Sequence, residues 1–328
     1  MNRNENELAV IATYGGPLNV DVGYKRSWLG QKGVLSKDHL PKFHLGKLAG
    51  MTLAVDTLDD IRMFFTEIDE SEDQIELVET GAELEQALAR GHFPVILCAS
   101  YKVIGADAGV VPFLRKLGVR LFSLSTNVRN LLADGCGERS ASGLSYLGLE
   151  VVQLLEQSSI LPDVSHLSDV GFWDLYGHTS GPIVATHSNA RTLCDTPRNL
   201  DDNQLKAIAE RGGLVGISTY PTLVAENHAS LENLLDHIDY LVDQVGIEHV
   251  AIGTDFVSFI GSLFDAKLAQ ADPDGKLYKE YGTSTLTEGI GRFEQVVNLV
   301  DGLVRRGYEG ECLEKILSKN YIRLLDRS

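Results

Sequence analysis

Short apolar runs alternate with amphipathic segments along most of the chain. Eight of the runs have the length and composition of buried strands: Leu8–Thr13, Met51–Val55, Pro94–Ala99, Arg120–Leu124, Leu161–Ser165, Pro182–Thr186, Leu214–Ser218 and Val250–Gly253. Segments with helical periodicity lie between most of them: Ala82–Arg90, Val110–Leu117, Tyr146–Gln157, Asp169–Tyr176, Asp201–Arg211 and Leu231–Val245. A strand followed by a helix, repeated eight times, is typical of an α/β fold of the (β/α)8 TIM barrel type. An open, doubly wound parallel sheet is the alternative, because periodicity alone does not show whether a sheet closes.

No shift in composition divides the chain, so we expect residues 1–328 to form a single barrel domain. Two segments are longer than most connections in compact domains. Residues 17–48 and 266–287 have weak periodicity, and we expect both to be extended loops at the barrel mouth, where loops set substrate choice. The stretches Glu288–Leu303 and Gly310–Leu325 are amphipathic and predict a C-terminal helical extension.

Composition and charge narrow the function classes. The net charge of −17 argues against nucleic acid or an anionic membrane surface as a partner. The polar start has no apolar signal segment, and no uncharged apolar run approaches the roughly 20 residues that span a bilayer. The cysteines lack CxxC spacing, so neither a disulfide framework nor a cysteine zinc site is indicated. We therefore expect a soluble, cytoplasmic protein with a small-molecule substrate.

Two histidines stand directly after neighbouring predicted strands. His166 ends the run Asp163-Val-Ser-His, and His187 follows it by 21 residues in Ala185-Thr-His. Because parallel strands end at the same edge of a barrel, where active sites are built, we expect both imidazoles at the barrel mouth. Neutral imidazole is a good ligand for Zn²⁺, which makes the pair a candidate metal site. The alternative is that each histidine only completes a turn through a hydrogen bond.

Two further residues could complete an active site at the same edge. Asp255 follows the eighth predicted strand, where a carboxylate can ligate a metal or accept a proton during catalysis. Its alternative role is a helix N-cap or a loop hydrogen bond. Arg198 lies downstream of His187, and a guanidinium there could bind a substrate carboxylate through paired hydrogen bonds. The alternative is a surface arginine that pairs with Asp201 or Asp202.

Several ordered motifs resemble the renal (membrane) dipeptidase family, peptidase family M19. They are Asp163-Val-Ser-His-Leu-Ser-Asp-Val-Gly-Phe-Trp-Asp174, Ala185-Thr-His-Ser-Asn-Ala-Arg191, Pro197-Arg-Asn-Leu200, Ile252-Gly-Thr-Asp-Phe256 and Leu131-Leu-Ala-Asp-Gly-Cys-Gly-Glu138. The resemblance is dense from about residue 110 to 260 and thin before it. It implies an amidohydrolase-type barrel that cleaves dipeptides with two zinc ions, and members of the family often form homodimers.

The resemblance also implies roles for particular residues. His166 and His187 match the two imidazole ligands of one metal, and Asp255 matches the aspartate that serves the other metal and handles protons. Arg198 matches the arginine that binds the terminal carboxylate of the substrate. Asn127, which follows the fourth predicted strand, is expected to bind substrate with it.

The sequence departs from the family at three places. The family carries His-x-Asp after the first strand, where this chain has Tyr14 and Gly16. The Glu that bridges the metals after the third strand is replaced here by Ala99, and a substrate-polarising His becomes Thr126. His39 and His44, in the first long segment, could supply a ligand if the first strand is aligned differently.

These departures leave three hypotheses. The first is a dipeptidase-like hydrolase with one zinc ion, held by His166, His187 and Asp255, that cleaves an amide in a dipeptide-like or N-acyl amino acid substrate. The second is a metal-free, inactive homologue that binds a ligand or a partner. The third is a changed chemistry in which Tyr14 or Cys98 acts in the emptied pocket. Retention of the two histidines favours the first hypothesis, and loss of the other ligands favours the second.

Overall fold

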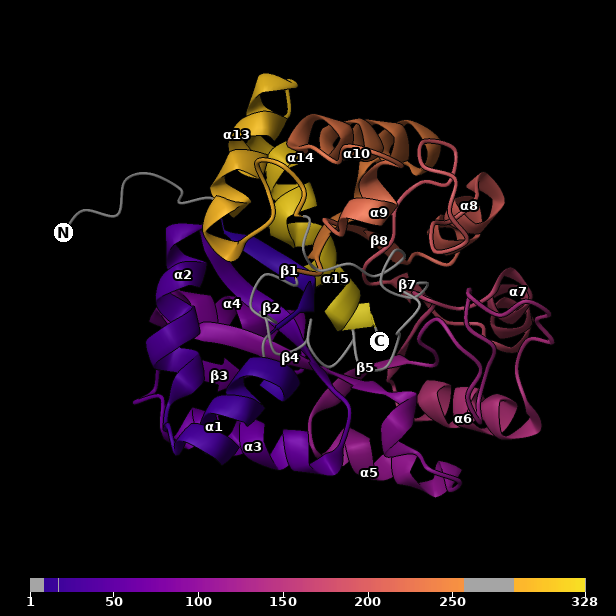
Figure 1. The fold of residues 1–328 in the computed structure, drawn as a ribbon, viewed down its shortest axis with the longest axis horizontal. Coiled ribbons are helices and arrows are strands. Elements are labelled where there is room, and N and C mark those ends of the chain that lie inside the picture. Colours follow the sequence, from indigo (N-terminus) through magenta and orange to yellow (C-terminus); the bar gives the residue numbers. More distant parts are fainter. Residues whose placement is uncertain (1–8, 17, 257–285, 328) are drawn as a thin grey trace.

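A closed ring of eight parallel strands forms the centre of the molecule (Figure 1). The computed structural model describes residues 9–16, 18–256 and 286–327. The ring consists of β1 (Val10–Gly15), β2 (Leu48–Val55), β4 (Phe93–Ser100), β5 (Val119–Ser123), β6 (Leu161–Asp163), β7 (Val184–Ala185), β8 (Leu214–Ser218) and β9 (Val250–Thr254). Pairing of β1 with β9 and of β2 with β4 closes it. The predicted TIM barrel is therefore confirmed, and the open sheet is excluded.

The eight predicted strands all correspond to strands of the ring. In β4, β5, β8 and β9 every residue is buried, which is why they read as continuous apolar runs. A further strand, β3 (Ile75–Leu77), was not predicted; it pairs with the beginning of β4 outside the ring. Three residues with a central Glu76 are too short and too polar to form a recognisable pattern.

Helices surround the ring (Figure 1). Their bounds are α1 (Gly23–Leu29), α2 (Leu40–Leu45), α3 (Leu58–Asp69), α4 (Gly81–Arg90), α5 (Val111–Lys116), α6 (Tyr146–Gln157), α7 (Asp169–His178), α8 (Asp202–Glu210), α9 (Pro221–Val224), α10 (Leu231–Val245), α13 (Val296–Arg305), α14 (Gly310–Glu314) and α15 (Asn320–Arg327). The six predicted helices between strands are confirmed. Within the described residues, no helix is both long enough and apolar enough to cross a bilayer.

The segment 17–48, predicted as an extended loop, is largely helical. It contains α1, α2 and two π-helical turns, and it lies against α3. The buried carboxylate of Glu67 in α3 accepts hydrogen bonds from Arg26 and, at 2.7 Å, from the backbone N–H of Leu35. The prediction was wrong because helices of six or seven residues are too short to show a period of 3.6 residues. Most of the second predicted loop, 266–285, lies outside the described residues.

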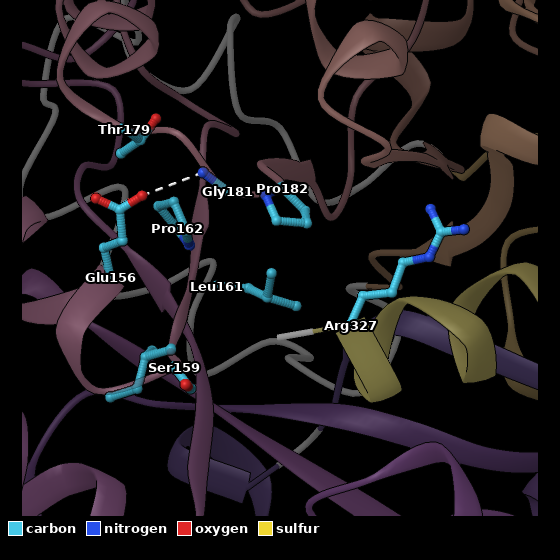
Figure 2. Close-up of a pocket in the computed structure, with 9 residues that line it drawn as sticks. Glu156, Ser159, Leu161, Pro162, Thr179, Gly181, Pro182 and Arg327 are labelled. Carbon is cyan, nitrogen blue, oxygen red and sulfur yellow. Dashed lines mark hydrogen bonds between the residues drawn. The ribbon is translucent and has the colours of Figure 1, made fainter.

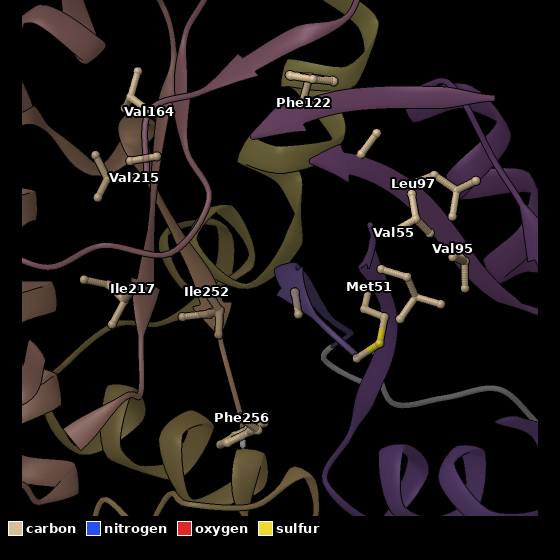
Figure 3. Packing of buried hydrophobic residues seen from close by; sticks show 14 of the residues in the cluster. Met51, Val55, Val95, Leu97, Phe122, Val164, Val215, Ile217, Ile252 and Phe256 are labelled. Carbon is tan, nitrogen blue, oxygen red and sulfur yellow. The ribbon is translucent and has the colours of Figure 1, made fainter. Parts of the chain in front are cut away.

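Two apolar layers flank the strands. Alternate strand residues face the helices, and Figure 3 shows part of this layer, including Met51, Leu97, Phe122 and Ile252. The other set faces into the ring and packs on α15: Ile11, Ile96, Leu121, Leu161, Val184, Leu214 and Ala251, with Tyr321, Leu324 and Leu325. Helices α13, α14 and α15 lie largely within the two stretches predicted to be helical, and α15 forms the floor of the barrel.

Toward the mouth, the inward-facing side chains become polar. Thr13, Cys98, Ser123, Asp163 and Thr186 are all buried there. The strands approach one another closely at this level. A Cβ added at Gly216 would lie only 2.1 Å from the Thr13 hydroxyl. A polar layer inside a barrel is costly unless its groups are hydrogen-bonded, so its pattern of donors and acceptors is well defined.

A loop between β5 and α6 carries Asn127 to the barrel mouth, and Asp134 fixes its shape. The buried Asp134 carboxylate accepts hydrogen bonds from Arg129 Nε and from the backbone N–H of Ser142, both at 2.5 Å. The Arg129 guanidinium holds the pKa of Asp134 below its usual value. The loop is therefore held by an ionised carboxylate.

Asp134→Asn is expected to lower the free energy of unfolding at pH 7 by about 1–2 kcal/mol. Because the folded-state pKa is depressed, the stabilisation is present above the unfolded value of about 3.9 and is lost as the pH falls through the folded pKa. Urea unfolding at pH 7 and near pH 3 checks this, with Asp243→Asn at an exposed position as the control. A difference that stays constant with pH would contradict the assignment.

Candidate metal centre

The two predicted histidines meet at the mouth of the barrel. His166 follows β6 and His187 follows β7, and these strands are neighbours in the ring. The Nε2 atoms of the two imidazoles are 3.0 Å apart. His166 has a φ of 71°, a conformation that costs energy for a residue with a side chain and is concentrated at functional sites. The prediction that the two imidazoles lie together is confirmed, and their role as metal ligands stays a prediction.

Hydrogen bonds define which nitrogen of each imidazole carries the proton. His166 Nδ1 donates to the Asn127 side-chain carbonyl at 2.7 Å, and that oxygen also accepts from the Cys136 thiol. His187 Nδ1 lies 2.7 Å from the Thr186 hydroxyl, which gives its own proton to Asp163 and must therefore accept from the imidazole. Both Nε2 atoms consequently carry lone pairs, and these lone pairs face each other.

Both imidazoles are neutral in this environment. Burial, followed by the nearby charge of Arg198, holds the pKa of His166 and of His187 well below the usual value. Two neutral nitrogens with opposed lone pairs repel each other, whereas a cation between them is attracted to both. Zinc binds imidazole nitrogen at about 2.0–2.1 Å, which places two ligands of a tetrahedral ion about 3.3 Å apart. The observed 3.0 Å is slightly shorter than that spacing, so both nitrogens can ligate one divalent ion that lies beside the line joining them.

The predicted third ligand does not join the histidines. Within the described part of the chain, no three imidazole, thiol or carboxylate side chains converge as a metal site. Asp255 instead accepts a hydrogen bond from the Ser218 hydroxyl at 3.3 Å. Burial raises the pKa of Asp255 to about 6, and its φ of 62° again places a strained residue at the mouth. A ligand role for Asp255 therefore stays a prediction that this arrangement does not support directly.

Arg198 is anchored beside the histidines rather than on the outer surface. It is 9% exposed, and it donates to the His187 carbonyl and to the Ser188 hydroxyl, each at 2.8 Å. These bonds fix the plane of a guanidinium that has five N–H donors, so the group is prearranged to meet a carboxylate. The alternative prediction was a surface arginine paired with Asp201 or Asp202. Arg198 is instead buried and bonded to His187 and Ser188.

The positions of the missing family ligands are occupied in other ways. The Tyr14 ring stacks on His187, with centroids 3.8 Å apart and an interplanar angle of 13°. Gly16 has a φ of 112°, which residues with a side chain rarely adopt, and a Cβ there would lie 2.1 Å from Leu53 Cδ2. His39, proposed as a substitute ligand, is buried against Asp21 in the 17–48 segment.

The strand-end position of the bridging glutamate needs a correction. Ala99 shares the helix-facing side of β4 with Val95 and Leu97, so it does not face the mouth. Ser100, one residue later, lies on the inward side and donates to Asp56 at 2.6 Å. Thr126, at the place of the polarising histidine, hydrogen-bonds with Tyr101 at 3.2 Å. Neither Ala99 nor Ser100 can replace a bridging carboxylate.

Sequence reasoning missed the groups that support the histidines. Asp163 and Thr186 hold His187, and Asn127, predicted to bind substrate, is the hydrogen-bond partner of His166. Asp163 lies in a quoted motif, three residues before His166, and Thr186 directly precedes His187. The signal was therefore present, but the hydrogen bonds depend on the pairing of β6 with β7.

A closed parallel barrel with imidazoles and an anchored arginine at the carboxyl ends of its strands is the architecture of dipeptidase-type hydrolases. The chain belongs to the membrane dipeptidase family, peptidase family M19, whose model matches residues 39–269. The resemblance noted in the sequence is thereby confirmed.

Relatives and solved structures agree with this family. The chain is 31% identical over 219 residues to an uncharacterized protein in the pqqA 5′ region of Klebsiella pneumoniae, covering 63% of this chain and 72% of that one. It is 24% identical over 273 residues to dipeptidase verJ of Clonostachys rogersoniana, covering 82% of this chain but only 64% of the relative. A Rhodobacter sphaeroides metallo peptidase, liganded with a phosphinate mimic of the dipeptide L-Ala-D-Ala, shares the fold with a TM-score of 0.80. That match has 21% identity and covers 98% of this chain and 99% of that chain.

Proposed function

We propose that the protein is a dipeptidase-like hydrolase with a single zinc ion, which cleaves an amide bond in a dipeptide-like or N-acyl amino acid substrate. The proposal rests on two neutral imidazoles, those of His166 and His187, whose Nε2 atoms carry lone pairs and lie 3.0 Å apart. Ligating histidines usually donate their other N–H to a fixed acceptor, as both do here.

The side chains around the pair divide the remaining tasks. His166 and His187 would hold the zinc, which as a Lewis acid polarises an amide carbonyl and lowers the pKa of water. Arg198 binds the carboxylate of the substrate and so fixes the position of the scissile bond. Asp255, held by Ser218, lies at the same mouth and receives the proton that the attacking water loses.

The donor set fits one ion and not two. A second ion would need the ligands that the family carries after its first and third strands. Tyr14 fills the first of these places. Gly16 has no side chain and a backbone conformation that other residues rarely adopt, and Ser100 offers only a hydroxyl that is engaged with Asp56. We therefore propose a reduced, mononuclear site in a family that uses two ions.

A metal-free binding protein is the second candidate, and two observations favour it. Catalytic zinc usually has three protein ligands, and within the described residues no third imidazole, thiol or carboxylate joins the pair. In addition, Tyr14 stands where the family has a metal ligand, and its ring stacks on His187 instead. Such a protein would keep Arg198 for carboxylate recognition without hydrolysing its ligand.

Zinc titration of the chelator-treated protein, followed by assay against a panel of dipeptides and N-acyl amino acids, separates the two candidates. We expect one binding site per chain, and we expect hydrolysis to appear as that site fills. Absence of zinc binding, together with carboxylate-dependent binding of uncleaved dipeptides, would instead establish the binding protein. Two equivalents of zinc would contradict the mononuclear site.

A further inference from the structure

A buried carboxylate is linked to the imidazole of His187 through a single hydroxyl group. Asp163, at the end of β6, is 0% exposed and faces into the barrel. Its Oδ1 accepts from the backbone N–H groups of Ser165 and Thr186, each at 3.0 Å. Its Oδ2 accepts from the hydroxyls of Ser123 and Thr186, each at 2.7 Å. All four donors are neutral N–H or O–H groups, so both oxygens of Asp163 act as acceptors at these four contacts.

The Thr186 hydroxyl connects this carboxylate to the candidate metal centre. A hydroxyl has one proton, and that of Thr186 is given to Asp163 Oδ2. Its oxygen can then only accept at the 2.7 Å contact with His187 Nδ1, so the imidazole must carry its proton on Nδ1. Because Asp163 Oδ2 accepts from the Thr186 hydroxyl, it determines through that one hydroxyl which nitrogen of His187 carries the proton.

We propose that Asp163 is a positioning residue that holds His187 in the Nδ1-protonated tautomer and thereby makes Nε2 a ligand. The tautomer assignment stands on the hydrogen bonds alone, and its consequence for metal binding rests on the single-zinc function proposed above. Asp163 itself does not touch the metal or the substrate. It orients the Thr186 hydroxyl, and that hydroxyl orients the imidazole of His187.

An asparagine at position 163 would reverse donor and acceptor along the hydrogen-bond chain from residue 163 through Thr186 to His187. Its carbonyl can still accept from the two backbone N–H groups, while its amide N–H points at Thr186. Thr186 then accepts from the amide and gives its proton to His187 Nδ1, which moves the imidazole proton to Nε2. That Nε2–H can donate to the lone pair of His166 Nε2 at 3.0 Å. A hydrogen bond between the two histidines would then occupy the place of the cation.

The test is Asp163→Asn, read by ¹⁵N NMR of histidine-labelled, metal-free protein at pH 7.5. The His187 signals are assigned by their loss in His187→Gln. We expect Nδ1 protonation in the unmodified protein and Nε2 protonation in the variant, with zinc affinity reduced about 10- to 100-fold. Ser123→Ala is the matched control, because it removes one donor to the same carboxylate and leaves Thr186 untouched. It should keep the tautomer.

Thr186 provides a second, independent reading if Asp163→Asn does not fold. Thr186→Val removes the hydroxyl, so His187 should lose its preference for the Nδ1-protonated tautomer and zinc should bind more weakly. Thr186→Ser keeps the hydroxyl and should keep both the tautomer and the zinc affinity. An unchanged Nδ1–H in folded Asp163→Asn or Thr186→Val would overturn the inference. If the unmodified protein binds no zinc but the tautomer still switches, the inference stands and the proposed single-zinc function fails.

Discussion

His187→Ala is expected to bind no zinc and to lose at least about 1,000-fold in kcat/KM on any dipeptide that the unmodified protein cleaves. The variant removes one of the two facing Nε2 lone pairs, and a single imidazole cannot retain the ion against water. Metal analysis of protein purified without added zinc gives about one equivalent for the unmodified chain and none for the variant under this proposal.

The control for this experiment is a histidine removed elsewhere. His178 is exposed on α7 and bonds only to the carbonyl of Asp174 among the contacts described, so His178→Ala should keep its zinc and its activity. Because His187 is 1% exposed and stacks on Tyr14, thermal unfolding must show that His187→Ala is folded. A folded His187→Ala that still binds one zinc ion would refute the proposed site.

Arg198→Lys is expected to lower kcat/KM about 100-fold for substrates with a free C-terminal carboxylate. Arginine offers a planar pair of donors that lysine cannot reproduce, and hydrogen bonds to charged groups contribute about 1.5–3 kcal/mol. The same dipeptides with an amide in place of the carboxylate should be poor substrates of both proteins and should distinguish them much less. Steady-state kinetics on such a matched pair measures the effect.

Arg191→Lys provides the comparison, since Arg191 pairs with Asp169 at 2.7 Å outside the site. Its effect should be small and equal for carboxylate and amide substrates. If Arg198→Lys affects both substrates equally, Arg198 serves only to hold the His187 carbonyl and Ser188, and the proposed substrate contact is wrong.

The barrel was predictable because parallel strands buried on both faces leave long apolar runs. Each run of the ring was found from that pattern, and Leu231–Val245 and Tyr146–Gln157 match their helices residue for residue. The 17–48 segment was not predictable, because its short helices depend on contacts such as Glu67 with the backbone of Leu35. α3 was also missed, although its capping box of Thr57 and Asp60 is a readable start signal.

The candidate site was predictable in its residues and not in its geometry. Strand-end position placed His166 and His187 together, since neighbouring parallel strands end at one edge. The sequence does not show which residues of β4 face into the barrel. Ala99 was therefore predicted at the inward-facing strand end, where the structure has Ser100. A one-residue error moves a side chain to the opposite face of a strand, and only the strand pairing resolves it.

The floor formed by α15 has a consequence for the folding of this chain. Ile11 near one end of the sequence and Leu84 in α4 share a packed cluster with Leu324 and Leu325. The inner apolar lining of the ring is therefore covered only once residues 321–325 have packed against it. A chain in which this helix is undocked would expose the lining to water, and exposed apolar surface of this kind favours aggregation.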